Sequence, residues 1–271
     1  MGRPPRLYWL MSIVLLGCQA PPASGDPQPA QPASGNEAEH WLERAEKRLE
    51  KIKSIKAKIK YVRIEGVGLF DSKETRKGDL VYQPGPPTRF SVHFQQLIAE
   101  NRATKIGHRF IYNRGWLVEC DDVQKVFRKQ QMLASDADPA KAGPLGLGDT
   151  PFIVPINLPK KQLVKKHVVT LVARDKNDPP NSVHLLLKPK PNIRTDIIRI
   201  DLWYDRTTVL LIRAESVDDG PNKNIVELSM VEVDRPIGAK VFDVSSPPKG
   251  EGWDVTIELH PSVRAPEGGG R

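Results

Sequence analysis

The segment Asp196–Val244 constrains the fold most, because it contains three successive runs in which apolar and polar residues alternate. A period of two is typical of strands with one apolar and one wet face. The apolar positions of the three runs are Ile198, Ile200, Leu202 and Tyr204, then Leu210, Ile212 and Ala214, then Val226, Leu228 and Met230. Only short turns rich in Asp, Gly, Pro and Asn separate the runs, and connections this short join antiparallel strands. The segment therefore predicts an antiparallel meander.

Similar runs extend this sheet toward the N-terminus and the C-terminus. Further strands are expected at Tyr61–Phe70, Lys77–Gln83, Arg89–Gln95, Glu100–Lys105, Phe110–Tyr112, Trp116–Cys120, Val123–Arg128, Val168–Arg174, Ser182–Lys188 and Lys240–Val244. Turn residues such as those of Pro84–Pro87 punctuate them. The segment Val255–Ile257 is a candidate for a short addition to a sheet edge. The predicted fold class is α+β, mainly antiparallel β.

One strong helix is expected before the sheet, at Glu37–Lys60. Its apolar residues recur every three or four positions and form one stripe: Leu42, Ala45, Leu49, Ile52, Ile55 and Ile59. A single stripe indicates a single packed face, and the sheet is the only large surface available to receive it. A coiled-coil dimer is the alternative, although the stripe is short for one.

The first eighteen residues have the pattern of an export signal. Arg3 and Arg6 precede the ten-residue apolar run Leu7–Leu16, which is too short to span a bilayer. The run closes on Leu15-Leu16-Gly17-Cys18, which is similar to the lipobox of bacterial lipoproteins, where the cysteine thiol takes a diacylglycerol. A plain secretory signal with a chance cysteine is the alternative. Gln19 in place of aspartate favours the outer over the inner membrane.

Composition divides the remainder of the chain. Residues 19–36 are rich in Pro, Ala, Ser and Gly and are expected to form a disordered tether; residues 37–255 are expected to form the folded domain, and residues 256–271 a flexible tail.

The formal net charge is +8 from 41 basic and 33 acidic residues, and the basic residues are spread along the sequence rather than interleaved with aromatic residues. Nucleic acid is therefore not an expected partner. With Cys18 acylated, Cys120 has no disulfide partner, and its apolar surroundings predict a buried thiol.

The segment Gln130–Lys166 differs from the rest of the domain. It contains Asp-Pro, Gly-Pro and Leu-Gly-Leu-Gly elements and many apolar residues, but no alternation that a strand would need. Long apolar insertions of this kind serve as lids or binding loops. Short helical pieces that cap a barrel end are an equally good interpretation, and the pattern alone leaves both open.

No chemistry is indicated by sequence motifs. None of the six histidines has metal-ligand spacing to another histidine, a cysteine or paired carboxylates. The chain contains no Gly-x-Ser-x-Gly elbow, phosphate loop or dinucleotide fingerprint. No catalytic residue, metal or cofactor is therefore expected, and the chain is predicted not to be an enzyme.

The order of motifs resembles the LolA/LolB lipoprotein-carrier superfamily. An amphipathic helix precedes Lys77–Phe90, which is similar to the family pattern G-x-L-x-x-x-x-P-G-x-x-R-F/W. Asp149–Phe152 and the meander follow, and Val241–Gly250 is similar to the closing pattern F-x-F-x-x-P-x-G. The resemblance covers the chain from about Glu37 to Val255. Two features depart from soluble LolA: the lipobox, which suits the anchored LolB type, and the long insertion Gln130–Gly148.

The resemblance implies a curved, incomplete β-barrel with an N-terminal helix, a helical or loop lid, and a cavity for acyl chains. By analogy with the arginine of the family hairpin, Arg89 is expected to hold the lid closed. Alternation on the strands assigns these residues to the cavity: Phe90, Phe94, Ile200, Leu202, Ile212, Leu228 and Met230. The lid residues are expected to include Phe152, Ile153 and Ile156. The predicted partners are acyl chains of lipoproteins or lipids and a membrane, reached through the N-terminal anchor by a monomeric protein.

Together these observations predict an envelope protein on the periplasmic side, tethered by its lipid, that receives or transfers lipoproteins or lipids. The alternative is a regulatory or structural envelope lipoprotein that uses the same fold without transport, as the RseB type of sigma-factor regulator does.

Overall fold

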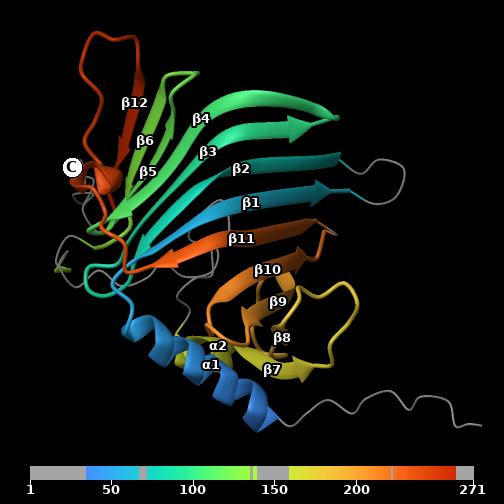
Figure 1. Cartoon of the computed structure of the whole chain (residues 1–271). Coiled ribbons are helices and arrows are strands. Elements are labelled where there is room, and N and C mark those ends of the chain that lie inside the picture. The colour runs from blue at the N-terminus through green and yellow to red at the C-terminus, as the bar shows by residue number, and fades with distance from the viewer. Residues whose placement is uncertain (1–34, 67–71, 135–136, 139–158, 221, 261–271) are drawn as a thin grey trace, which may run out of the picture. The chain divides into compact units, whose positions relative to one another are not determined.

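The computed structural model describes residues 35–66, 72–134, 137–138, 159–220 and 222–260, all within the unit Pro32–Arg271. Within these ranges twelve strands form one sheet, accompanied by two α-helices and a 3-10 helix (Figure 1). The helices are α1 (Gly35–Glu50), α2 (Lys160–Lys166) and η3 (Ala239–Phe242). The strands are β1 (Ile55–Glu65), β2 (Ser72–Gln83), β3 (Arg89–Ala99), β4 (Arg102–Asn113), β5 (Trp116–Asp121), β6 (Val126–Gln131), β7 (His167–Val172), β8 (Ser182–Pro189), β9 (Ile197–Asp205), β10 (Leu211–Asp218), β11 (Lys223–Val233) and β12 (Asp254–Glu258).

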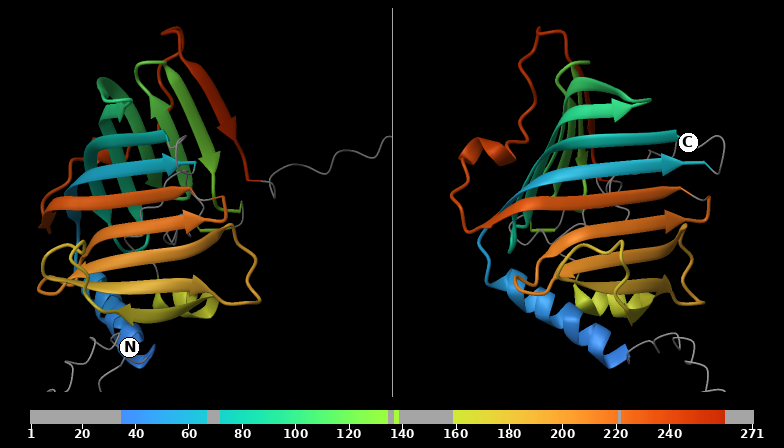
Figure 2. Two further views of the ribbon diagram at one scale, coloured as in Figure 1. Left: turned by 90° about the vertical axis from the view of Figure 1, so that its right-hand side faces the viewer. Right: turned by 45° about the vertical axis from the view of Figure 1, so that its right-hand side comes forward.

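The strand order is β12-β6-β5-β4-β3-β2-β1-β11-β10-β9-β8-β7. Every neighbouring pair is antiparallel except β12 and β6, which run parallel. The two edges, β12 and β7, do not pair with each other, so the sheet stays open, and Figure 2 shows its curvature. The predicted fold class is confirmed: a curved, mainly antiparallel sheet of the α+β class. No helix among the described residues is long and apolar enough to cross a membrane.

The predicted helix Glu37–Lys60 is wrong in its second half. The helix α1 ends at Glu50, and β1 begins at Ile55. In the segment Ile55–Glu65 the apolar residues fit both spacings, because Ile55 and Ile59 are four apart and also two apart from the buried Ala57. Isoleucine at this density favours a strand, and pairing with β2 on one side and β11 on the other decides the outcome.

The predicted final strand Lys240–Val244 is also wrong, because these residues form η3 and the extended segment after it. The chain then returns to the sheet as β12, which adds a parallel edge strand beside β6 (Figure 1). Two other expected strands, at Glu100–Lys105 and Phe110–Tyr112, are one continuous strand, β4. Its turn into β5 occurs at Arg114 and Gly115, which both have positive φ.

The amphipathic face of α1 packs against one face of the sheet, called here the helix-covered face. Ala38, Trp41, Leu42 and Ala45 join a cluster with β7, β8, β9 and β10, and Leu163 of α2 joins the same cluster. Burial of each large apolar side chain stabilises the fold by about 1.5–3 kcal/mol. The helices are also linked by Lys160, whose Nζ lies 3.4 Å from a carboxylate oxygen of Glu43.

A smaller cluster lies on the other face of the sheet. It contains Ile111, Val118, Cys120 and Phe127, and Val244 and Trp253 from the segment after η3 pack against it. Asn113 donates a 2.9 Å hydrogen bond to the carbonyl of Phe242, which fixes η3 beside the start of β3 and the end of β4. The segment between β11 and β12 therefore covers the face opposite the helices.

Candidate functional site: the helix-covered face

The helix-covered face carries a continuous apolar surface. One cluster spans β1, β2, β3, β4 and β11, and the second spans β7 to β10. Both lie on the same face, because Val226 of the first cluster is paired directly with Ala214 of the second, and directly opposed residues share a face.

Five of the seven predicted cavity residues occupy this face. Phe94 and Leu228 are buried in the first cluster, and Phe90 packs against it with its ring stacked on Tyr112. Ile200 and Leu202 are buried in the second cluster. Alternation therefore placed these side chains on one face, and their contact with a ligand stays a prediction.

The expectation for Met230 is wrong, because its side chain is 78% exposed. A bulge is the physical reason. The ladder between β1 and β11 shifts between Lys56 and Lys58, so that two residues of β11, Met230 and Val231, oppose the single residue Ala57. Met230 takes a left-handed φ of 50°. From this point the alternation is inverted, and Val231 rather than Met230 packs against the apolar cluster.

Ile212 lies at a second irregularity, where the ladder between β10 and β9 shifts between Leu211 and Arg213. Its side chain is half-buried and belongs to neither apolar cluster, whereas the neighbouring Leu211 and Ala214 are buried in one. The bulge again moves the apolar face by one residue.

The apolar surface ends in a pocket of about 350 Å³ at the rim formed by β2 to β6. Its apolar lining comes from Leu97, Ile106 and Val126, and Ile106 also contacts the first apolar cluster. Its polar lining consists of Arg76, His108, Glu119, Asp121, Gln124 and Arg128. A second cavity of about 230 Å³ lies beside it, lined by Phe110 and Leu117 and by polar residues of β5, β6 and β12.

The polar groups of the larger pocket are linked in a chain. Arg76 pairs with Glu74, and its Nη1 lies 3.5 Å from Nδ1 of His108. The other ring nitrogen of His108 lies 2.9 Å from Glu119 Oε1, and the ring packs 4.5 Å from that of Phe110. The hydrogen bond with His108 lowers the pKa of Glu119, although burial works in the opposite direction. Glu119 is therefore a carboxylate at neutral pH, and the pocket offers cations, a carboxylate and an apolar floor together.

Arg89 forms no hydrogen bond or ion pair with any described residue of the predicted lid. Its guanidinium carbon lies 5.2 Å from the centre of the Phe242 ring, in η3. Arg89 belongs to the motif Lys77–Phe90 and Phe242 to the motif Val241–Gly250, so these two motifs of the family resemblance contact each other in the fold. The lid residues Phe152, Ile153 and Ile156, and the lipid-attachment residue Cys18, lie outside the described residues.

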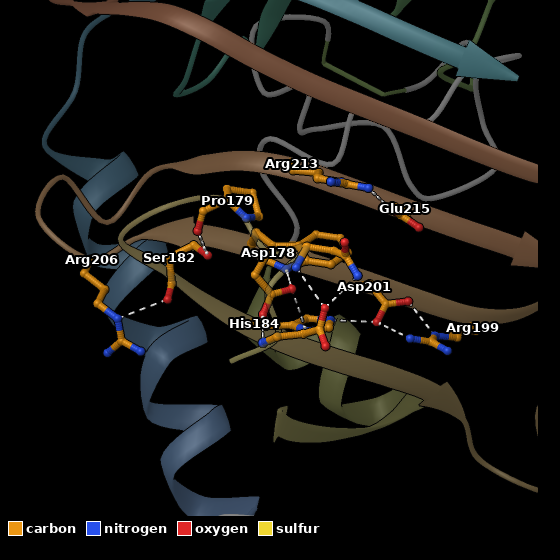
Figure 3. A network of polar contacts seen from close by, with 12 residues as sticks. Asp178, Pro179, Ser182, His184, Arg199, Asp201, Arg206, Arg213 and Glu215 are labelled. Carbon is orange, nitrogen blue, oxygen red and sulfur yellow. Dashed lines mark hydrogen bonds and ion pairs between the residues drawn. The ribbon is translucent and has the colours of Figure 1, made fainter. Parts of the chain in front are cut away.

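A buried histidine network on the opposite face was not found from the sequence. His184 Nε2 lies 2.7 Å from Asp201 Oδ1, and its Nδ1 lies 3.6 Å from Asp178 Oδ1 (Figure 3). Its ring stacks on Trp203, whose Nε1 donates to Asp178 at 2.7 Å. Arg199 forms two hydrogen bonds to Asp201. Asp178 and His184 form one group and Arg199, Asp201 and Trp203 another, and the pairing of β8 with β9, which places His184 opposite Trp203, brings the two groups together.

This network holds the loop before β8 against the sheet. Burial alone would raise the pKa of Asp201, but the hydrogen bonds from His184 and Arg199 outweigh it and lower that pKa. The nearby hydroxyl of Ser182 donates to the carbonyl of Pro179 at 2.7 Å and is thus not a nucleophile activated by His184. The hydrogen bonds of this network are those of a structural link between the loop and the sheet.

Cys120 is buried as predicted, and burial raises the pKa of its thiol to about 11. In the described part of the chain, no group of three or more histidine, cysteine or acidic residues is arranged to hold a metal ion. The thiol is therefore a small apolar packing group at neutral pH.

No protein-family model and no curated protein matches the sequence. Among solved structures, an uncharacterized conserved protein from Thermus thermophilus superposes with a TM-score of 0.47 at 10% identity, covering 83% of this chain and 99% of its own. The lipoprotein LppX from Mycobacterium tuberculosis gives 0.39 at 10% identity, covering 76% and 99%. A LolA superfamily protein from Nitrosomonas europaea gives 0.31 at 9% identity, covering 76% and 97%.

These likenesses concern the arrangement of the chain, and at such identities they assign neither ligand nor activity to it. The curved, incomplete and mainly antiparallel β-barrel expected from the sequence is confirmed: the sheet is open, and α1 and α2 pack on one of its faces.

Proposed function

We propose that the protein is a membrane-tethered envelope protein that binds acyl chains of lipoproteins or lipids on its helix-covered face, and that it acts in their reception or transfer. One observation carries the proposal: the apolar surface of this face runs directly into the larger pocket, through Ile106. Burial of an acyl chain contributes ~0.8 kcal/mol per methylene, so such a site requires an apolar bed and no catalytic group.

The pocket also suits the polar end of an amphiphile. Its volume of about 350 Å³ falls at the small end of the range of ligand sites. Arg76 and Arg128 line it together with Glu119. A ligand whose chain lies on the apolar surface would place its polar group among these side chains, where charge-assisted hydrogen bonds fix orientation.

Ligand binding is tested on the full chain carrying Cys18→Ser, so that no lipid on residue 18 is counted as ligand. Mass spectrometry of an organic extract identifies co-purified acyl compounds, and displacement of a fluorescent fatty acid measures affinity. Ile106→Arg places a charge on the pocket floor and is expected to weaken binding at least tenfold. Met230→Arg, at an exposed position, is the matched control and is expected to bind like the parent protein.

The proposal fails if the extract contains no acyl compound and the probe does not bind. It also fails if Ile106→Arg and Met230→Arg bind the probe equally well, because the pocket would then have no part in binding.

Tethering rests on the sequence Leu15-Leu16-Gly17-Cys18 after a ten-residue apolar run. Cys18→Ser in the native host is expected to release the protein from the membrane fraction or to block its processing. Unchanged fractionation and an unchanged mass would remove this part of the proposal. Placement in the outer membrane rests on Gln19 and is tested by separating the two membranes of the host.

A further inference from the structure

Two segments of the chain contain seven cations and no acidic residue. Residues 159–173 include Lys160, Lys161, Lys165 and Lys166, and residues 182–195 include Lys188, Lys190 and Arg194. The formal net charge of the whole chain is +8, so these seven residues account for all but one of the excess positive charges. The remainder of the chain is therefore close to neutral, although its sequence contains many lysines and arginines.

The fold brings the two segments together at one corner of the sheet. The helix α2 runs directly into β7, and β7 pairs with β8 so that Val168 lies opposite Lys188. The N–H of Lys190 donates to the carbonyl of Lys166 at 2.9 Å, and a turn from Lys190 leads to Arg194. We call the seven cations at this corner the basic corner.

Most side chains of the basic corner have no ion pair with a described residue. Lys160 is the exception, since its ammonium lies near Glu43 and Glu39 of α1. Among the described residues, the other six side chains form no ion pair or hydrogen bond, and all are exposed except the half-buried Lys190. The leucine of α2, Leu163, is buried, so the helix turns Lys161 and Lys165 outward.

Elsewhere on the sheet, cations lie next to carboxylates on neighbouring strands. Lys60 of β1 pairs with Glu227 of β11 at 2.8 Å, and Lys58 pairs with Asp79 of β2 at 2.5 Å. Among the described residues, the basic corner shows this compensation only at Lys160, and like charges at such density repel one another. An anionic partner would relieve the repulsion and be attracted by the cations of this corner.

From this arrangement we infer that the basic corner docks the protein on a surface of anionic phospholipids. Six of the seven cations are lysines, which act as compact point charges rather than as planar bidentate ligands. Neither segment contains Phe, Trp or Tyr, so stacking platforms for nucleic-acid bases are absent from them. Val168, 51% exposed on the edge strand β7 opposite Lys188, adds an apolar contact at the centre of the corner. Diffuse positive charge around a projecting valine fits a lipid headgroup layer.

Docking at this corner also sets an orientation. From β7 to β6 every neighbouring pair of strands is antiparallel, so strand starts and strand ends alternate along each rim of the sheet. The rim that carries the start of β7 and the end of β8 therefore also carries the start of β2, the end of β3 and the start of β4. The larger pocket is lined by residues of that rim, including Arg76, Leu97 and Ile106. Docking at the basic corner does not require acyl binding. It would, however, turn the rim that carries the larger pocket toward the bilayer.

The test uses the full chain with Cys18→Ser, so that no lipid anchor contributes, and two vesicle preparations. One contains phosphatidylcholine alone and the other phosphatidylcholine mixed with phosphatidylglycerol; co-sedimentation measures the partition coefficient. A lysine near an anionic surface strengthens binding by about 1 kcal/mol, or roughly fivefold. The triple variant Lys165→Glu, Lys166→Glu, Lys190→Glu is therefore expected to bind mixed vesicles at least ~100-fold more weakly.

The matched control makes the same change of net charge at exposed lysines outside the corner, Lys51→Glu, Lys77→Glu and Lys249→Glu. It is expected to bind mixed vesicles within about tenfold of the parent, because charges more than a Debye length away are screened. Thermal unfolding of both variants checks their folding, and a Lys→Gln version of the corner variant repeats the test with less change of charge. Acyl-probe binding in solution is expected to be equal in all of them, because the substituted residues lie outside the pocket.

Support requires binding that depends on phosphatidylglycerol, falls with salt and is lost selectively in the corner variants. The inference is overturned if the parent protein does not distinguish the two vesicle types, or if corner and control variants lose binding equally. Tighter binding of the parent to a DNA oligonucleotide than to mixed vesicles, with the same dependence on the corner, would overturn it in favour of a nucleic-acid surface.

Discussion

Replacing Gly78 by alanine tests the close approach of β2 and β3. A Cβ at this position would lie 1.9 Å from the carbonyl oxygen of His93 and 2.8 Å from the Cα of Phe94. Both obstacles are backbone atoms of β3, brought near by the register shift between Lys77 and Gly78. Real Cβ contacts keep at least 3.0 Å, so the strands would have to separate by 1.1 Å at this point.

The loss of unfolding free energy in Gly78→Ala depends on which atoms must move to make room for the added Cβ. Overpacking a core costs about 1–3 kcal/mol when side chains give way. Here the rigid ladder between two central strands must open, which places the loss at the upper end, near 3 kcal/mol. Alanine recovers about 0.5–1 kcal/mol of backbone entropy in a strand. The net expectation is a loss of about 2–3 kcal/mol of unfolding free energy, or a melting temperature lower by roughly 5–10 °C for a domain of this size.

Urea unfolding followed by far-UV circular dichroism measures the change. Gly238→Ala is the matched control, because Gly238 has a φ of −66° and no atom within 4 Å of an added Cβ. Its stability is expected to be unchanged or about 0.4–1 kcal/mol higher. A Gly78→Ala protein as stable as the Gly238→Ala protein would show that β2 and β3 do not approach as described.

Three other outcomes follow from the structure. At the bulge in β11, Met230→Lys is expected to change the unfolding free energy by less than ~0.5 kcal/mol, whereas Val231→Lys should cost at least ~1 kcal/mol; the reverse order would contradict the bulge. In the Cys18→Ser protein, Cys120 is expected to resist a thiol reagent at pH 8 until the protein unfolds, since burial raises its pKa to about 11; rapid labelling of the native state would refute its burial. Burial lowers the pKa of His167 below its ordinary value of 6.5, so the stability that the neutral ring contributes is complete above pH 6.5 and is lost as the pH falls below it. His167→Gln should therefore flatten the decline of stability below pH 6.5, and an unchanged slope would assign that decline to other groups.

The alternation of apolar and polar residues predicted most strands of the sheet. It failed where the spacing of apolar residues fits a helix and a strand equally well. Ile55 and Ile59 satisfy helical and strand spacing together, and only the ladders to β2 and β11 decide between them. Met230 was assigned correctly to a strand but to the wrong face, because a bulge adds one residue to one strand without leaving a mark in the sequence. Long-range pairing thus supplied the information that the period of the pattern could not.

The candidate site was predictable only in its apolar half. Alternation put Phe94 and Leu202 on one face, yet the polar pocket depends on Arg76, His108 and Glu119 from three different strands. The histidine network of His184 and the basic corner have the same origin. The sequence contains their residues in separate short segments, and pairing across β7, β8 and β9 brings those segments together into clusters.

The basic corner gains strength from the proposed anchor. Residues 19–36 are expected to form a flexible tether, and eighteen residues of coil span roughly 25 Å. A domain held that near a bilayer experiences the lipid surface at an effective concentration of about millimolar, so even weak attraction by six lysines and arginines would favour the docked state. Anchor and corner would then have separate effects. Removing the proposed lipid by Cys18→Ser would abolish membrane residence at high salt. Reversing charges at the corner would leave the anchored protein on the membrane and change only which rim of its sheet faces the lipid.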